Sequence, residues 1–320
     1  MITQVTPVTV REIYLWGDGN KVAPFDTGSV AVLAFVTLYN LLDRVNINVN
    51  SNCFVSSTGK LPALLTPSDT QKHGFKAIQY HLFDHSAKTL TTESRFLNEG
   101  FLEFVDEKFQ VITNYNYFLE KENYEKYSRG VFQKLLPFPL QYSPPLAFRS
   151  HALQICDLVG IGAGDAFNEE DMEELKELNE KEKRLRDTPI LNKTQGSQVK
   201  ISLSQVLAKK NILTNMKVLG LLEELIDTYI QLKAESTSQY LFNSETYTTS
   251  EILFFSHLYA NTADCLANPF IKNYLKQKYP ELLRLTARFA RNSGIEKDQQ
   301  KDSTKVTLLG AVRDNIKSYV

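Results

Sequence analysis

Apolar positions in the first part of the chain form short strand-like runs around one helix-like run. "REIYLWG" at 11–17 is rich in strand formers, and "VNINVN" at 45–50 alternates apolar and polar residues as a half-buried strand does. Between them, the segment from about Val30 to Leu42 is apolar nearly all round and follows Asp26 or Thr27, either of which can cap a helix. We therefore predict a helix that is buried on most of its faces.

A proline marks the next strand-like run, "GKLPALL" at 59–65. Pro62 has no N–H for a sheet ladder, so it argues against a central strand unless the strand begins there. A proline in that position often follows a cis peptide bond, and we predict one before Pro62. "GFKAIQYHLF" at 74–83 then has apolar residues at helical spacing. Strand, helix, strand, strand and helix in this order predict a thioredoxin-like domain over residues 11–90.

Helical patterns dominate from residue 91 onward. The fold class predicted for the whole chain is therefore α+β, with an all-helical domain over 91–292 behind the thioredoxin-like one. Within it, residues 165–200 are strongly charged and are expected to form a solvated insertion. A polar tether over 293–305 and an amphipathic helix over 306–320 complete the expected organisation. The apolar face of that last helix consists of Leu309, Val312, Ile316 and Val320.

Charge and cysteine content exclude several classes of protein. The 36 basic and 37 acidic residues nearly cancel, so no overall field attracts nucleic acid. Three cysteines far apart in the chain predict neither a disulfide framework nor a zinc site. The longest apolar segment is too short to span a bilayer, and the first ten residues lack the pattern of a secretory signal. We expect a soluble or peripheral protein.

Two motifs resemble ligand sites but lack a needed residue. His81 and His85 lie one helical turn apart, yet Leu82 stands where the metalloprotease pattern requires glutamate. "GIGAGD" at 160–165 resembles a dinucleotide-binding loop, but Asp165 replaces the last glycine and would repel phosphate. We therefore predict no metal and no cofactor.

"KLPAL" followed by "GFKAIQYHL" resembles the proline strand and following helix of the glutathione transferase superfamily, and "APFDTGSVAVLAF" at 23–35 resembles its first turn and helix. The resemblance implies that superfamily's two-domain fold. Ala23, however, stands where thiol-using members carry cysteine, and only Thr27 and Ser29 offer hydroxyl groups nearby. Gly74 and Phe75 replace the residues that bind the γ-glutamyl group, and the bulk of Phe75 is expected to close the pocket. We therefore predict no catalytic residue, and assign Trp16, Pro62 and Phe75 structural roles.

Three further stretches resemble the metaxin family, in particular the larger metaxin-like subunits of the fungal mitochondrial sorting and assembly machinery (SAM). They are "IYLWG", "GKLPALL" and above all "NYEKYSRGVFQKLLPFPLQYSPPLAFRSHA" at 123–152. The resemblance implies a non-catalytic scaffold, peripheral on the cytosolic face of the mitochondrial outer membrane. Its implied partners are the β-barrel assembly subunit, a second metaxin-like subunit and the general import translocase.

Two surfaces are candidate partner contacts. "FIKNYLKQKYPELLRLTARFAR" at 270–291 contains six basic residues and one acid, and could face the acidic cytosolic segment of a translocase receptor. The terminal helix could dock on its own domain, on a partner or on the membrane surface. Two alternatives stay open: an active transferase or peroxidase that uses Ser29 or Thr27, and a cytosolic adaptor without a mitochondrial role. The candidate contact residues are Lys272, Lys276, Arg284, Arg288, Arg291, Leu309, Val312 and Ile316.

Overall fold

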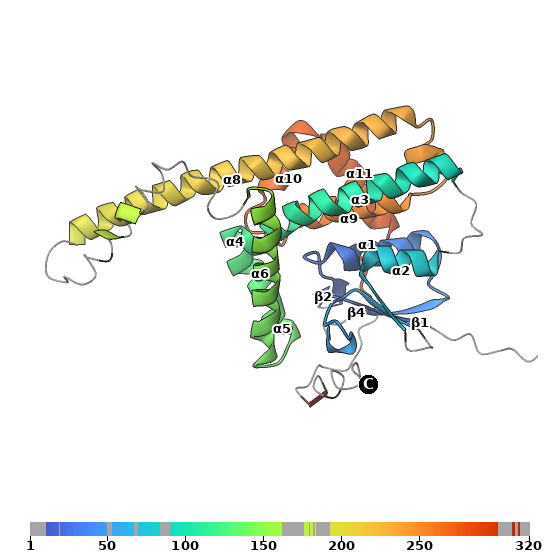
Figure 1. The fold of residues 1–320 in the computed structure, drawn as a ribbon, viewed down its shortest axis with the longest axis horizontal. Coiled ribbons are helices and arrows are strands. Elements are labelled where there is room, and N and C mark those ends of the chain that lie inside the picture. Colours follow the sequence, from blue (N-terminus) through green and yellow to red (C-terminus); the bar gives the residue numbers. More distant parts are fainter. Residues whose placement is uncertain are drawn as a thin grey trace, which may run out of the picture.

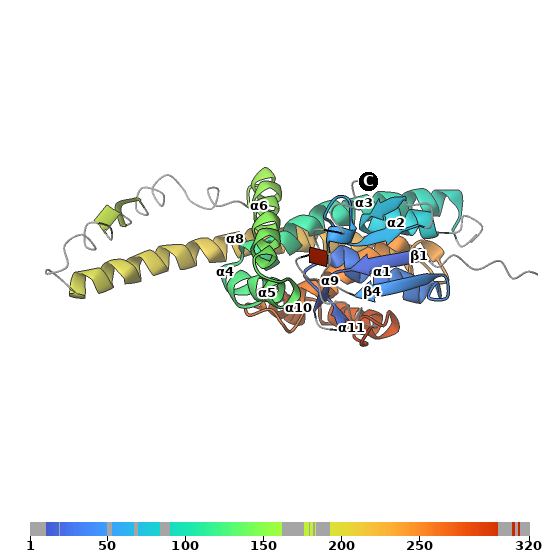
Figure 2. The same cartoon turned by 90° about the horizontal axis from the view of Figure 1, so that it is seen from below.

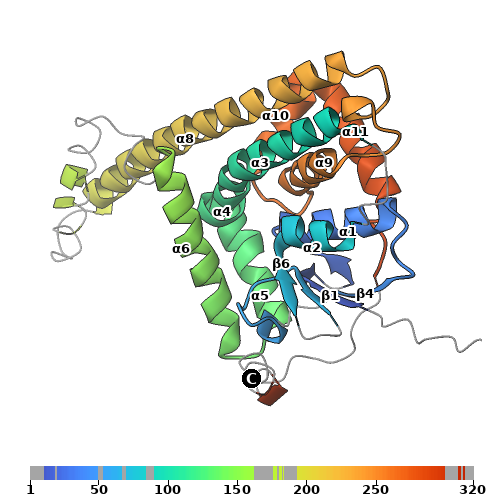
Figure 3. The ribbon, with the colours of Figure 1, turned by 45° about the vertical axis from the view of Figure 1, so that its right-hand side comes forward.

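A small mixed sheet with two helices forms the first part of the protein, and helices form the rest (Figure 1). The structure, a computed structural model, describes residues 11–18, 20–49, 53–66, 70–83, 90–161, 176–178, 180, 181, 183, 193–299, 309, 310 and 313. The acidic stretch, the 160–165 motif beyond Ile161, and His85 therefore lie mostly or wholly outside the described residues. Figure 3 shows the arrangement in layers, with α1 and α2 between the sheet and the helices α3 and α9.

The four-stranded sheet has the order β4-β1-β5-β6, which confirms the predicted thioredoxin-like layout. Its strands are β1 (Arg11–Leu15), β4 (Val45–Val49), β5 (Ala63–Leu65) and β6 (Gln71–His73). The central strand β1 runs parallel to β4 and antiparallel to β5, so that Ile13 pairs with Ile47 on one side and with Leu64 on the other. A small hairpin of β2 (Gly17–Asp18) and β3 (Lys21–Val22), which the sequence pattern did not predict, follows β1.

Helix α1 (Thr27–Leu38) begins and ends earlier than predicted. Asp26 is its N-cap, and the Asp26 side chain accepts a hydrogen bond from the Ser29 backbone N–H. The helix ends because Tyr39 leaves the helical conformation and Asn40 has a positive φ of 52°. As predicted, α1 is buried nearly all round, since every residue from 29 to 36 is buried.

The loop before β5 brings Pro62 to the start of the strand, and the Leu61–Pro62 peptide bond is cis, as expected. The 3₁₀ turn Cys53–Val55 lies in the same connection. Helix α2 (Gly74–Leu82) follows β6 directly, and the Gly74 N–H donates to the carbonyl of Pro62 at 3.0 Å. This bond holds the start of α2 against the proline loop.

The helical part contains two long helices and several short ones. Helix α8 extends well beyond the rest of the molecule (Figure 2). Two π-helical segments, Tyr115–Leu119 and Tyr124–Ser128, interrupt the path from α3 to α5. The α-helices are α3 (Thr92–Asn114), α4 (Lys121–Asn123), α5 (Arg129–Leu135), α6 (Ser143–Leu158), α8 (Lys193–Glu235), α9 (Thr249–Asn261), α10 (Phe270–Lys278) and α11 (Pro280–Asn292), with 3₁₀ turns at Leu140–Tyr142 and Leu241–Asn243.

Helix α9 connects the two parts because it packs against both α3 and α1. Twelve of its thirteen residues are buried. Residues 249–292 form the three helices α9, α10 and α11. Helix α9 ends at Asn261, whereas α10 begins directly after Pro269 and α11 begins at Pro280. Proline is tolerated at the start of a helix because the N–H it lacks has no partner there.

The segment expected to begin a polar tether instead starts as a packed turn. Ser293 and Ile295 are buried, and the N–H of Gln299 donates to the carbonyl of Asn20 at 2.7 Å. Leu309 belongs to the apolar face expected for the terminal helix, and it is 83% exposed. Val312 and Ile316 lie outside the described residues, so the terminal helix stays a prediction.

Candidate functional site

A cavity of about 800 Å³ lies between the thioredoxin-like part and the helical part. The first turn of α1, the loop from Cys53 to Pro62 and the start of α2 form one side of it. Helices α3, α6 and α9 form the other side. The expectation that this site is closed is therefore wrong.

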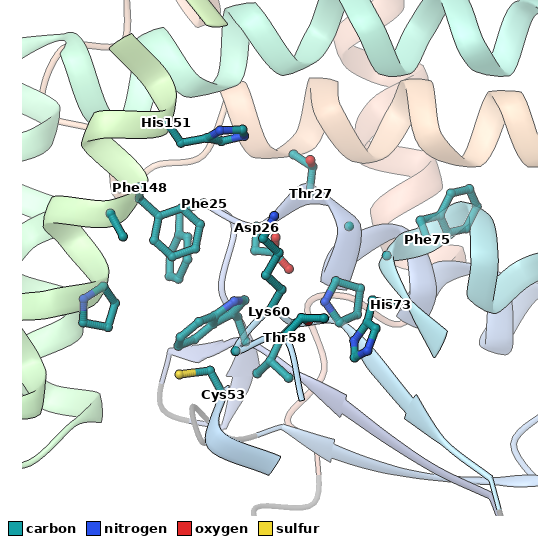
Figure 4. A pocket seen from close by; sticks show the side chains of 18 of the residues that line it. Phe25, Asp26, Thr27, Cys53, Thr58, Lys60, His73, Phe75, Phe148 and His151 are labelled. Atoms are coloured by element: carbon teal, nitrogen blue, oxygen red, sulfur yellow. The ribbon is translucent and has the colours of Figure 1, made fainter. Parts of the chain in front are cut away.

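Phe75 does not cover the cavity because its ring packs into the core beside α1. It is 5% exposed and makes an edge-to-face contact with Phe35, with ring centroids 6.2 Å apart. In Figure 4 it lies at the far end of the cavity from Phe148. Pro62, which was also assigned a structural role, lines the cavity from the loop before β5.

One wall of the cavity is aromatic. Phe25 and Phe148 face each other with ring centroids 5.8 Å apart (Figure 4), and Phe118 stacks on Phe148 at 5.1 Å. Trp16 completes this wall and contacts Phe25 at 5.7 Å. Trp16 thus does have the predicted packing role, but at the edge of an open space. The pattern of the sequence could not show this, because Phe118 and Phe148 are distant from Trp16 along the chain.

Three basic side chains also line the cavity: Lys60 and His73 on the thioredoxin-like side, and His151 on α6 beside Phe148 (Figure 4). Burial lowers the pKa of both histidines, and the nearby charge of Lys60 lowers each further, so they are neutral at pH 7. The Ser56 hydroxyl lies 3.3 Å from His73 Nδ1 and helps to fix that ring. Sequence reasoning singled out none of these three residues, since no local motif connects them.

The hydroxyl of Ser29 serves the fold rather than the cavity. Ser29 is fully buried, and its Oγ accepts a hydrogen bond from the Trp16 N–H at 3.0 Å and donates one to Asp26. Burial raises the pKa of Asp26 to about 6, although its hydrogen bonds with Ser29 lower it. Thr27, by contrast, lines the cavity. Of the two N-cap residues that the sequence offered, Asp26 holds that position.

The thiol of the cavity belongs to Cys53, which sequence reasoning did not single out. Ala23, at the position where related enzymes carry cysteine, is buried, and its N–H donates to the Trp16 carbonyl at 2.9 Å. Burial raises the pKa of the Cys53 thiol to about 11. Only about one molecule in ten thousand would carry the reactive thiolate there at pH 7, so Cys53 is a poor nucleophile.

A buried polar network lies behind the cavity on α3 and α9. Thr113 Oγ1 lies 3.0 Å from His257 Nδ1 and accepts a hydrogen bond from Asn261 at 2.8 Å. The His257 ring stacks on Phe109 with centroids 4.9 Å apart. Burial lowers the pKa of His257 to about 3, so it is neutral and acts as part of the packing between the two helices.

The basic residues predicted on α10 are partly neutralised within the chain. Lys272 forms an ion pair with Asp264, and the neighbouring Lys278 forms one with Glu223. Lys276 is exposed and has no such partner among the described residues. Only part of the expected charge on this helix is therefore available to another molecule.

The basic residues on α11 form an exposed row. Arg284 pairs with Glu281 on the same helix, and both side chains are 73% exposed, so solvent weakens their attraction. Arg288 and Arg291 are also exposed, three and four residues apart on one face. Of the predicted basic surface, α11 therefore leaves more positive charge without a firm ion-pair partner than α10 does.

An apolar row along α6 and the turn before it was not predicted. Phe138 contacts Tyr142 of the 3₁₀ turn edge-to-face at 6.0 Å, and Leu146 and Leu153 lie two turns apart on one face of α6. Their exposed fractions are 73%, 46%, 64% and 37% in chain order. Exposed large apolar residues that share one face are typical of a contact surface.

The described part of the chain offers no group of three or more potential metal ligands. Within the same residues, every helix is too short or too polar to cross a lipid bilayer.

Two family models match the chain. One, described as Tom37, an outer mitochondrial membrane transport complex protein, matches residues 29–149, and the Tom37 C-terminal domain matches residues 167–306. The second match extends through the acidic stretch. Of the residues that line the cavity, the matches include Lys60 and Phe148 but not Trp16, Phe25 or His151.

Curated relatives carry the name metaxin. "Metaxin-1" of Mus musculus is 25% identical over 195 residues, which is 58% of this chain and 58% of the mouse protein. "Metaxin-1 homolog" of Drosophila melanogaster is 26% identical over 132 residues, covering 39% of this chain and 38% of that protein. "Metaxin-1" of Macaca fascicularis is 23% identical over 52% of each chain. The chain therefore spans about half the length of the curated relatives it matches.

Proposed function

We propose, since the chain belongs to the Tom37/metaxin family of outer mitochondrial membrane transport complex proteins, that it is a non-catalytic scaffold subunit of the SAM. Its task would be to support the insertion and release of β-barrel precursors and to couple this step to the general import translocase. The observation that carries the proposal is the match of two family models over both parts of the chain.

The chemistry of the cavity supports a role without catalysis. The hydroxyl of Ser29 is occupied by two hydrogen bonds within the fold. The thiol of Cys53 is kept protonated by burial. A nucleophile in an enzyme must reach its substrate and is usually activated by a base or a lowered pKa. Ser29 is fully buried and does not line the cavity, and the pKa of Cys53 is raised.

The surface supports contacts with partners of two kinds. The apolar row along α6 and the turn before it would contact the β-barrel assembly subunit or the second metaxin-like subunit; it consists of Phe138, Tyr142, Leu146 and Leu153. The exposed arginines of α11 would face the acidic cytosolic segment of a translocase receptor. Both contacts would suit a chain that lies peripherally on the cytosolic face of the outer membrane.

The open cavity is the observation that favours the competing function, a glutathione-dependent transferase or peroxidase. Thr27 would then supply the hydroxyl, because it lines the cavity and Ser29 does not. Thiol-dependent turnover that is lost in Thr27→Val would support this alternative over the scaffold.

Affinity purification of the tagged chain from mitochondria in mild detergent, with quantitative mass spectrometry, tests the proposal. The scaffold predicts a β-barrel assembly subunit and a second metaxin-like protein in stoichiometric amounts. A matched variant, Leu146→Glu with Leu153→Glu, should lose at least one of them while its melting temperature stays unchanged. A chain that purifies without membrane partners would contradict the proposal.

A further inference from the structure

One wall of the cavity is aromatic and the opposite wall is basic. The proposed scaffold role requires neither of these walls. Trp16, Phe25, Phe118 and Phe148 form the aromatic wall, and Lys60 lines the cavity from the loop before Pro62, across from Phe148 on α6. Cavities of 300–1,000 Å³ with mainly apolar walls and a few fixed polar groups are typical of small-molecule sites. At about 800 Å³, this cavity has the size and composition of such a site.

The basic wall lacks an internal counter-charge. Among the described residues, no carboxylate lies within ion-pair distance of the Lys60 ammonium group. Two acids line the cavity: Asp106 is paired with Lys76 at 2.8 Å, and Asp26 is hydrogen-bonded to Ser29 beyond ion-pair distance of Lys60. An anion beside Lys60 would therefore meet a positive charge that has no direct ion-pair partner among the described residues.

Other hydrogen-bond donors that line the cavity also lack acceptors within the chain. Trp16 lines the cavity, and its indole Nε1 is buried without a hydrogen-bond partner. Thr27 and Gly28 also line it, and they stand in the first turn of α1, where backbone N–H groups have no partner within the helix. A buried donor left unpaired destabilises the fold, and an acceptor atom on a bound molecule would relieve this.

We propose that this cavity binds a single organic anion with an aromatic body. The rings of Phe25, Phe118 and Phe148 contact the aromatic part by edge-to-face and stacked packing. Lys60 attracts the anionic group from the opposite wall. The site goes beyond the proposed scaffold function, because it needs neither the membrane nor a partner protein.

Two dyes of matched shape test the proposal on the full-length chain. 8-Anilinonaphthalene-1-sulfonate carries the anion, and N-phenyl-1-naphthylamine has the same rings without it. Trp16 is the single tryptophan of the chain, so energy transfer from it reports binding in this cavity. We expect the sulfonate to bind with a stoichiometry of one and about tenfold more tightly than the neutral dye, a ratio that corresponds to one ion pair of moderate strength.

Two variants separate the cavity from the outer surface. Lys60→Gln should remove the preference for the sulfonate, whereas Lys134→Gln, an exposed lysine on α5 outside the cavity, should leave it unchanged. Ala147→Phe, which adds a ring within the cavity wall, should weaken both dyes at least tenfold. Equal affinity for the two dyes, no effect of Lys60→Gln, or several equivalent sites insensitive to Ala147→Phe would overturn the proposal. These results would leave the scaffold proposal untouched, since its test measures partners in mitochondria.

Discussion

The Oγ atom of Ser29 accepts a hydrogen bond from the backbone N–H of Trp16 at 3.0 Å, across thirteen residues of chain. The same hydroxyl donates to Asp26, the N-cap of α1. The bond links the end of β1 to the first turn of α1 at a fully buried position. A hydroxyl that the sequence offered as a candidate nucleophile therefore holds two elements together.

Ser29→Ala should destabilise the protein by about 1–3 kcal/mol, because the buried Trp16 N–H loses its acceptor. Urea unfolding at pH 7 measures this loss. Any glutathione-dependent turnover should be the same in the variant and the wild type.

Thr27→Val is the matched control, since Thr27 lies in the same turn but its hydroxyl has no hydrogen-bond partner among the described residues. Its unfolding free energy should change by less than about 0.5 kcal/mol, as is usual for a substitution that breaks no hydrogen bond. Equal destabilisation by the two substitutions would show that the Ser29 bond does not carry the effect.

His257 should make the protein less stable in acid. Burial lowers the pKa of His257 to about 3 from the unfolded value of 6.5. Its contribution to the free energy of unfolding is therefore complete above pH 6.5 and is lost as the pH falls toward 3. Between pH 6.5 and 5 the wild type should lose roughly 2 kcal/mol relative to His257→Gln, at 1.36 kcal/mol for each pH unit. Parallel urea titrations at the two pH values measure the difference, and a gap that does not change with pH would contradict a neutral, buried His257.

Glu251 should have the opposite effect. Its carboxylate accepts from the Thr248 N–H at 3.1 Å in the capping box of α9, and burial raises its pKa to about 7 from 4.5. The contribution of Glu251 to the free energy of unfolding is therefore complete below pH 4.5 and is lost as the pH rises through 7. Glu251→Gln removes the charge and keeps a hydrogen-bond acceptor.

Between pH 4.5 and 7 the wild type should therefore lose up to roughly 3 kcal/mol relative to Glu251→Gln, again at 1.36 kcal/mol per pH unit. The comparison isolates Glu251, because Asp26, whose pKa is also raised by burial, contributes equally to both proteins. If the wild type gains stability relative to the variant over this range, the carboxyl group is not buried as described.

Charge reversal on α11 tests the proposed contact with an acidic segment. Arg288→Glu with Arg291→Glu should weaken binding to an immobilised acidic receptor segment at least tenfold at low ionic strength, and less at high salt. Lys272→Glu is the control, since Lys272 is already paired with Asp264 and contributes less free charge. Binding that withstands the double reversal would rule out this face of α11 as the contact.

The sheet and α1 could be predicted because each follows from a local pattern. Alternation from Val45 to Val49 and the apolar run from Val30 to Val36 leave little choice of element or face. Boundaries depended on capping instead, and the Asp26 cap moved α1 toward the N-terminus. The starts of α10 and α11 could have been found from Pro269 and Pro280 alone.

The cavity could not be predicted from the sequence, because its walls come from segments far apart in the chain. Phe75 was expected to fill it, and the direction of that ring depends on its contact with Phe35 in α1. Likewise, the facing positions of Lys60 and Phe148 depend on how α6 packs against the proline loop. Side-chain direction at a junction of two domains is a tertiary property that no local spacing records.

The central claim is that the chain supports β-barrel assembly without chemistry of its own. The direct measurement is the assembly rate of a labelled β-barrel precursor in mitochondria from cells that lack the chain. These cells would be supplied with either the wild type or Thr27→Val with Cys53→Ala, which removes the candidate nucleophilic hydroxyl and the thiol that line the cavity. The scaffold account predicts that both proteins restore assembly equally; restoration by the wild type but not by an equally stable double variant would contradict it.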